Sequence, residues 1–98
     1  MLINIYCNKI DKGKRYLEEI MKDIPKEDIV KYRVNACKTF LELIDGTIYR
    51  VILATDSARG NKCNFAYIDT DISMEIIRNI IYPSIVYSNE ASPQTMYY

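Results

Sequence analysis

Residues 2–7, LINIYC, and the segment that follows them, residues 8–15, NKIDKGKR, decide the fold that this sequence predicts. The first segment is apolar with little alternation, which is the pattern of a strand buried on both faces of a sheet. After the glycine of the second segment, apolar side chains return every fourth residue, and this predicts an amphipathic helix over residues 14–24 that Pro25 ends. The domain therefore opens with a central strand, a basic loop and a helix.

Two further apolar segments are separated by a turn signal. Asp45-Gly46 lies between TFLELI, residues 39–44, and TIYRVILA, residues 47–54. Asp-Gly between two such runs is a strong β-hairpin signal, because both turn positions favour positive φ. A third segment, CNFAYID at residues 63–69, predicts another short strand that stops at its aspartate.

A second helix is predicted between Ser73, a candidate N-cap, and Pro83, and its many isoleucines indicate deep burial. The whole pattern predicts one small α/β domain over residues 1–87. We expect a two-layer or three-layer sandwich in which a sheet of about four or five strands, one β-hairpin included, packs on two main helices. Residues 88–98, SNEASPQTMYY, have the composition of a flexible C-terminal tail.

Length, charge and cysteine use limit the class of protein. A chain of 98 residues builds one core, and 13 basic against 13 acidic side chains give no net field that draws it to nucleic acid or membranes. Three cysteines without any histidine support neither a disulfide framework nor a zinc site, so reduced, buried thiols are expected. No apolar run approaches the length of a membrane helix, about 20 residues, which predicts a cytoplasmic protein.

The segment at residues 8–15 has the spacing of a phosphate-binding loop, G-x-x-x-x-G-K-[ST]. Asn8, Gly13 and Lys14 occupy the positions of the first glycine, the second glycine and the lysine, and asparagine tolerates the left-handed backbone better than most residues. Arg15 replaces the hydroxyl residue and gives magnesium no ligand. The same residues also fit an ordinary polar turn between a strand and a helix, so both interpretations stay open.

Several segments occur in an order that resembles the ATPase core of phage large terminases. They are NKIDKGKRYLEEI, the hairpin TFLELIDGTIYRVILA, the SARG segment at residues 57–60, and FAYIDTDI. The terminase family has a Walker A loop, a hairpin-rich sheet, an A-R-G segment and a hydrophobic run that ends in Asp-Glu. The resemblance extends over residues 2–85 and implies a degenerate P-loop NTPase core with a P-loop-like sheet.

The resemblance also implies a role for each matched polar residue. Lys14 would approach phosphate, Arg59 would lie near the nucleotide or a neighbouring subunit, and Asp69 would organise magnesium. Thr70 stands where the family has the glutamate that activates water, and Asp71 follows one residue late. Since the first glycine, the metal hydroxyl and the water-activating acid are all changed, no catalytic residue is predicted. The residues predicted to bind phosphate, if that function is retained, are Asn8, Gly13, Lys14, Arg15 and Arg59, and those predicted to bind metal are Asp69 and Asp71.

These departures favour a small, non-catalytic phage-type protein, a pseudo-ATPase without a cofactor that acts in the host-cell cytoplasm. It would bind a host or viral protein, as an inhibitor or anti-defence factor does. One alternative is a nucleotide- or phosphate-binding protein that uses magnesium and has weak or no NTPase activity. Another is a nucleic-acid-binding accessory protein, which the basic first loop favours and the zero net charge opposes. An uncovered strand edge would also allow a homo-oligomer, and no membrane partner is predicted.

Overall fold

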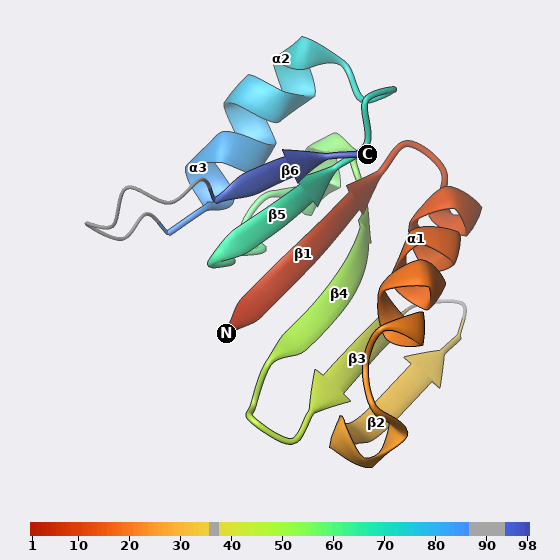
Figure 1. The fold of residues 1–98 in the computed structure, drawn as a ribbon. Helices are drawn as coiled ribbons and strands as arrows, with labels where there is room; N and C mark the ends of the chain where they lie inside the picture. The colour runs from red at the N-terminus through yellow and green to blue at the C-terminus, as the bar shows by residue number, and fades with distance from the viewer. Residues whose placement is uncertain (36–37, 87–93) are drawn as a thin grey trace.

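The strand order of one mixed sheet defines the architecture (Figure 1). The computed structural model describes residues 1–35, 38–86 and 94–98, and in these residues six strands pair in the order β2-β3-β4-β1-β5-β6. The strands are β1 (Leu2–Cys7), β2 (Ile29–Val34), β3 (Thr39–Leu43), β4 (Ile48–Leu53), β5 (Phe65–Ile68) and β6 (Thr95–Tyr97). The helical elements are α1 (Ile10–Lys22), the 3₁₀ turns η1 (Lys26–Asp28) and η2 (Asp56–Ala58), α2 (Met74–Ile76), the π-helical turn η3 (Ile77–Ile81) and α3 (Tyr82–Ser84). The predicted α/β fold is confirmed.

Strand β1 is the centre of the sheet, as its apolar sequence predicted. It pairs in parallel with β4 on one side and with β5 on the other. Residues 3–7 are buried, so the strand is covered on both faces. The antiparallel strands β2, β3 and β4 extend one side of the sheet, whereas β6 extends the other side in parallel with β5.

The sheet has more strands than the sequence predicted, because residues 29–34 and part of the predicted tail join it. Residues 95–97 form β6, and the amide of Tyr98 donates to the carbonyl of Ile68 (2.9 Å). The amide of Thr70 donates in turn to the carbonyl of Tyr98 (3.0 Å). The exposed edge of β5 gives this segment backbone partners that its polar composition did not indicate. Residues 88–93 of the predicted tail lie outside the described residues.

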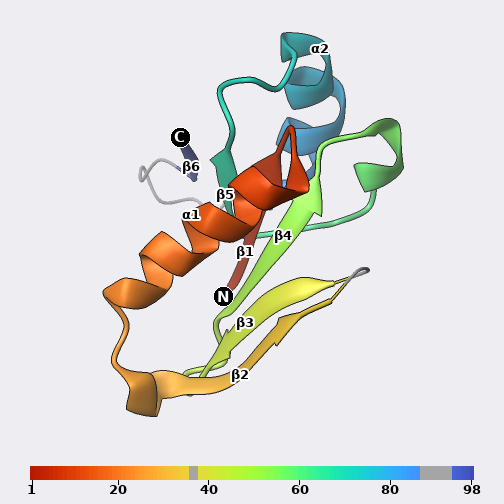
Figure 2. The same cartoon turned by 90° about the vertical axis from the view of Figure 1, so that its right-hand side faces the viewer.

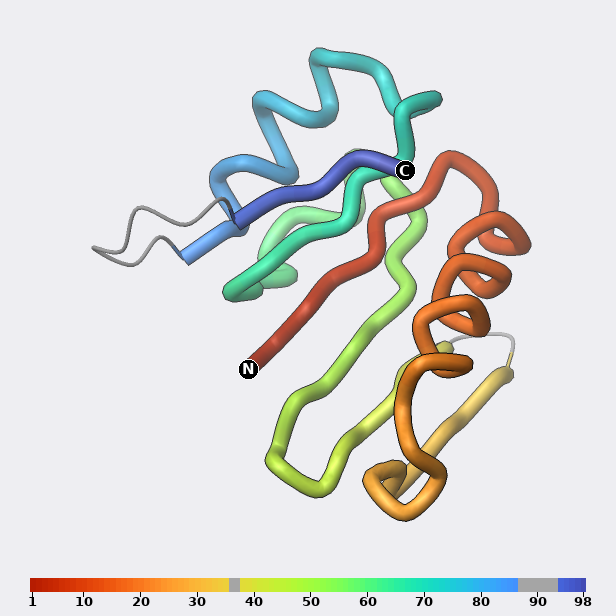
Figure 3. Tube along the Cα trace, viewed as in Figure 1, coloured from red at the N-terminus to blue at the C-terminus, as the bar shows by residue number. Residues whose placement is uncertain are grey.

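Helices cover the two faces of the sheet unequally (Figure 2). Helix α1 packs on one face, where Leu17 and Val51 belong to one buried cluster. The continuous helical segment α2-η3-α3 covers the other face beside β5, where Ile68 and Ile77 belong to a second cluster. The Cα trace shows this segment at the β5–β6 end of the sheet and the β2–β3 end without a helix on that face (Figure 3). The described residues therefore form three layers at one end of the sheet and two layers at the other.

The predicted hairpin between β3 and β4 is confirmed, but its turn differs from the predicted one. The carbonyl of Leu43 accepts from the amide of Gly46 (3.0 Å), and the carboxylate of Asp45 accepts from the amide of Thr47 (2.8 Å). Of the two central turn residues, Gly46 has positive φ, 90°, and Asp45 does not. This glycine therefore supplies the left-handed residue, while Asp45 stabilises the turn with its side chain.

Helix α1 begins at Ile10, one turn before its predicted start. The carbonyl of Lys9 accepts from the amides of Lys12 (3.0 Å) and Gly13 (3.4 Å), which closes the first turn. Gly13 is buried in this helix, and a Cβ atom there would lie only 2.6 Å from Cγ1 of Val51. Glycine is required because the helix approaches the sheet so closely. Only two residues then separate β1 from α1.

The second helix begins as predicted but continues further. The Oγ atom of Ser73 accepts from the amide of Ile76 (3.4 Å), which confirms the N-cap. The predicted end before Pro83 is wrong, because the helical segment runs through η3 into α3, where Pro83 lies in the first turn. Pro83 has no amide proton to donate within this segment, and the segment ends one residue later, at Ser84. Within the described residues, no helix has the length and apolarity needed to cross a membrane.

Candidate functional site

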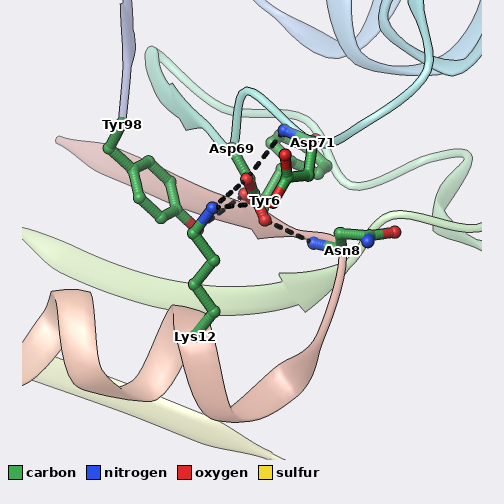
Figure 4. Close-up of polar contacts among 6 residues, drawn as sticks. All are labelled: Tyr6, Asn8, Lys12, Asp69, Asp71 and Tyr98. Carbon is green, nitrogen blue, oxygen red and sulfur yellow. Dashed lines mark hydrogen bonds and ion pairs between the residues drawn. The ribbon is translucent and has the colours of Figure 1, made fainter.

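The carboxyl ends of β1 and β5 lie side by side and lead to opposite faces of the sheet. Strand β1 continues into α1 on one face, and β5 continues toward α2 on the other (Figure 1). Neighbouring parallel strands that diverge in this way form the usual ligand crevice of open α/β sheets. Figure 4 shows the polar contacts at this point. The residues that make them are Tyr6, Asn8, Lys12, Asp69, Asp71 and Tyr98.

Asp69 is a fully buried carboxylate that three donors surround. The backbone amide of Asn8 donates to Oδ2 (2.9 Å), while the amide of Asp71 (2.9 Å) and Nζ of Lys12 (2.5 Å) donate to Oδ1. The amide of Asp69 itself donates to the carbonyl of Tyr6 (3.1 Å). The contacts with Asn8, Lys12 and Tyr6 join the end of β5 to the end of β1 and the start of α1, while the amide of Asp71 closes the turn after β5.

The surroundings of Asp69 keep it ionised. Burial by itself would raise the pKa of this carboxyl, but the ammonium of Lys12 and the amides of Asn8 and Asp71 outweigh burial and lower the pKa below its ordinary value. The hydrogen bond to Asp69 is also the main reason that the pKa of Lys12 is raised. A general base needs access to water and a pKa near the working pH, and Asp69 has neither.

Lys12 is the cation of the site. Its side chain is 35% exposed, and besides Asp69 it contacts Oδ2 of Asp71 at 3.3 Å. The ring of Tyr98 lies on another side of the ammonium, with its centroid 5.7 Å from Nζ. The described residues thus give this lysine two carboxylates and one aromatic face from the same chain.

Tyr98 packs over the site and is fixed by stacking and by its hydroxyl. Its ring stacks on that of Tyr16 with centroids 4.1 Å apart and planes 10° apart, and Tyr16 in turn meets the ring of Tyr67 edge-on at 5.2 Å. The hydroxyl donates to the carbonyl of Tyr6 (2.8 Å). Burial, followed by the nearby Cys7 and Asp69, raises the pKa of Tyr98, so the phenol keeps its proton and remains a donor.

Tyr98→Phe is expected to lower the free energy of unfolding by about 1 kcal/mol, because it removes one partly buried hydrogen bond and keeps the ring stack. Tyr82→Phe is the matched control, since the hydroxyl of Tyr82 bonds that of Tyr97 (2.6 Å) at an exposed position. Urea denaturation of both variants measures the difference. Equal losses for the two variants would contradict a role of the Tyr98 hydroxyl in closing the site.

The structure brings together three of the residues predicted to bind phosphate or metal. Asn8 contributes its backbone amide, and Asp69 and Asp71 share the ammonium of Lys12. Thr70, at the predicted glutamate position, has an exposed side chain and contributes its amide to the carbonyl of Tyr98.

The other predicted phosphate-binding residues lie elsewhere. Gly13, Lys14 and Arg15 are part of α1 rather than of a loop, because the helix starts before them. Within the described part of the chain, neither Lys14 nor Arg15 forms an ion pair. Arg59 follows η2 and donates to the carbonyl of Asn79 (3.4 Å) in η3. No hydrogen bond or ion pair of the described residues joins these side chains to Asp69.

Sequence reasoning missed Lys12 and the site role of Tyr98. A signal for the first existed, since Gly13 lies four residues before the buried Leu17 and extends the buried stripe back by one turn. A helix start before Gly13 would have placed Lys12 at the strand ends. No local signal could place Tyr98, because its hydroxyl bonds a carbonyl 92 residues away in the sequence.

Metal binding and thiol chemistry have little support here. In the described residues, no group of three or more His, Cys, Asp or Glu side chains could hold a metal ion. Cys7 and Cys63 are buried free thiols, and burial raises the pKa of Cys7 to about 11 and also raises that of Cys63. Neither is a thiolate at neutral pH, so neither is an activated nucleophile. Cys37 lies outside the described residues.

Comparison with protein-family models, with curated proteins and with solved structures found no match.

Proposed function

We propose that this chain is a small phage-type protein with a degenerate P-loop ATPase-like core, and that it acts without catalysis by binding a host or viral protein, as an inhibitor or anti-defence factor does. The observation that carries the proposal is the set of three donors around Asp69. The carboxylate that would organise magnesium in an ATPase is instead paired with Lys12 of the same chain.

A magnesium nucleotide would have to compete with this internal pair. Magnesium loses its water reluctantly, and it would displace a charged donor from a buried carboxylate to reach Asp69. Phosphate would also find few backbone amides, since only two residues connect β1 to α1 and the amide of Asn8 already donates to Asp69. Both features support a site that no longer handles phosphate.

The unequal covering of the sheet supports binding of a protein. Over β2 and β3, the face opposite α1 has no helix in the described residues (Figure 2). Exposed apolar side chains surround this end of the sheet: Val30 is 59% exposed, Val34 is 50% exposed and Ile44 is 69% exposed. We take the uncovered part of the sheet as the surface that a protein partner would cover.

Calorimetric titration with ATP, ADP and a cyclic dinucleotide, with and without magnesium, tests the proposal. We expect no saturable heat for the wild-type protein or for Lys14→Ala, because the internal pair occupies Asp69 and Lys14 lies outside the site. Circular dichroism of both proteins checks that they are folded.

Saturable binding by the wild type that Lys14→Ala abolishes would refute the proposal. It would favour the nucleotide- or phosphate-binding alternative, with the loop of residues 8–15 rearranged around the ligand. Measurement of phosphate release would then decide whether any NTPase activity accompanies binding.

A further inference from the structure

The face of β2, β3 and β4 opposite α1, here called the open face, has apolar side chains framed by basic ones. Backbone pairing places Arg33 opposite Phe40 and Phe40 opposite Arg50, so these three residues form one row across three strands. Leu41 follows Phe40 in β3 and Tyr49 precedes Arg50 in β4, and both belong to the cluster under α1. Because adjacent side chains of a strand point to opposite faces, Phe40 and Arg50 point away from α1. The residues of the open face are Lys31, Arg33, Phe40, Glu42, Ile48, Arg50 and Ile52.

A hollow of about 750 Å³ lies in the gap where β3 and β4 diverge, and its lining includes Ile10 of α1 and Val51 of the cluster under α1 besides residues of the open face. The pairing of β3 with β4 ends at Phe40 and Arg50. After Arg50, β4 pairs with β1 alone. The hollow is lined by apolar side chains that include Phe40, Ile48 and Ile52, and by the basic residues Lys38 and Arg50. This volume is within the range of small ligand pockets and accommodates a few apolar side chains of a partner.

The charge around the hollow is strongly one-sided. Four basic residues, Lys31, Arg33, Lys38 and Arg50, accompany one acidic residue, Glu42, which gives this surface a formal charge of 4 − 1 = +3. The whole chain has 13 basic and 13 acidic residues, so the remainder has a formal charge of −3. None of these four basic side chains has an ion-pair partner in the described residues. Their charge is therefore available to a partner of opposite sign.

Hydrogen bonds within the chain fix the side chain of Arg50. Its Nε atom donates to Oδ1 of Asn4 (2.9 Å), and its Nη2 atom donates to the carbonyl of Lys62 (3.0 Å). Asn4 is fully buried and is itself fixed by a hydrogen bond from Nδ2 to the carbonyl of Asn61 (2.7 Å). A guanidinium fixed in this way loses little conformational entropy when it binds a carboxylate.

We infer that the open face binds an acidic amphipathic segment of a partner protein, with its apolar side chains in the hollow and its carboxylates against the basic residues. The inference rests on the proposed function and names the chemistry of the partner. A surface that stacks nucleobases uses several aromatic side chains, whereas Phe40 is the single aromatic residue of the open face. Ile48 and Ile52 suit the aliphatic side chains of a protein better than bases.

Fluorescence anisotropy with defined probes tests this inference. The first probe is a labelled helical peptide of about 18 residues with leucine along one face and glutamate elsewhere. The second has the same composition in an order that removes the apolar face, and the third is an oligothymidylate. Arg33→Glu alters the open face at an exposed position, and Arg15→Glu is the matched control, since it makes the same substitution at an exposed position of α1 that also has no ion pair among the described residues.

We expect saturable binding of the amphipathic peptide that weakens about tenfold in Arg33→Glu, changes less than about twofold in Arg15→Glu, and decreases with rising salt. No binding at millimolar peptide, equal binding of the reordered peptide, or equal losses in the two variants would overturn the inference. Binding of oligothymidylate in place of the peptide would also overturn it and would identify a nucleic-acid surface. The peptide titration tests this inference, and the nucleotide titration tests the proposed function. Failure of one experiment therefore does not decide the other.

Discussion

Asp69→Ala is expected to lower the free energy of unfolding by about 3 kcal/mol or more, the largest effect of any substitution at the candidate site. The change removes the acceptor shared by the amides of Asn8 and Asp71 and the ammonium of Lys12. Donors left without a partner in a buried setting cost more than the hydrogen bonds themselves contribute. Urea denaturation followed by circular dichroism measures the loss.

Asp71→Ala is the matched control for this substitution. The side chain of Asp71 is 70% exposed, and its ion pair among the described residues is with Lys12, so its removal should change the free energy of unfolding by less than about 0.5 kcal/mol. The backbone amide of Asp71, which donates to Asp69, is retained in this variant. Similar losses for the two variants would show that the carboxylate of Asp69 does not organise the strand ends.

The pH dependence of the unfolding free energy gives a second test of the role of the Asp69 carboxylate. Because the pKa of Asp69 is lowered in the folded state, its carboxylate stabilises the fold above the ordinary pKa of aspartate, about 4. This stabilisation is lost as the pH falls from there through the lowered pKa. The difference in unfolding free energy between wild type and Asp69→Asn, which cannot titrate, should therefore be largest near neutral pH and shrink in acid. A difference that is constant down to acid pH would contradict the assignment.

Gly13→Ala is expected to destabilise the protein by about 2 kcal/mol, although the same change in an exposed helix stabilises by about 1 kcal/mol. The new Cβ atom would lie 2.6 Å from Cγ1 of Val51 and 2.8 Å from Sγ of Cys7. Both neighbours are buried side chains of central strands, so α1 must move away from the sheet or the strands must shift. Thermal or urea denaturation gives the sign of the effect.

A double-mutant cycle and an exposed control make this prediction sharper. Val51→Ala removes the nearest clashing atom, so Gly13→Ala should cost less in that background than in the wild type. Arg15→Ala, at an exposed position of the same helix, should change stability by less than about 0.5 kcal/mol. A stabilising Gly13→Ala would mean that α1 leaves room for a Cβ atom at this position and that its packing on the sheet does not require the glycine.

The position of Lys12 also bears on the interpretation of the basic first loop. In the sequence, Lys14 matched the phosphate-binding lysine, whereas in the structure Lys12 reaches the strand end and binds Asp69. The helix start explains the difference, because beginning α1 at Ile10 places Lys12 in the first turn, beside the ends of β1 and β5. A spacing that resembles a phosphate-binding loop therefore has a structural role here, since it joins α1 to β5.

The sequence by itself determined the features that depend on neighbouring residues. The apolar run of residues 2–7 made a central strand, Asp45-Gly46 made a hairpin, and Ser73 capped a helix. The end of β5 directly before Asp69 was also visible, because a short apolar run stops there. Each of these signals acts over a few residues through burial, turn conformation or capping, and such local preferences are independent of the rest of the fold.

Tertiary structure alone decided how the candidate site is closed. By sequence Gly13 fits a loop or a weakly favoured helix position, and only the structure shows that α1 approaches Val51 too closely there for a Cβ atom. Lys12 and Asp69 are 57 residues apart, and Tyr98 meets the carbonyl of Tyr6 across 92 residues. Contacts between such distant residues depend on which strands become neighbours, and no local preference records that. The sequence therefore placed a carboxylate at the strand end, but only the packed sheet and helix supplied the lysine and the tyrosine that close the site.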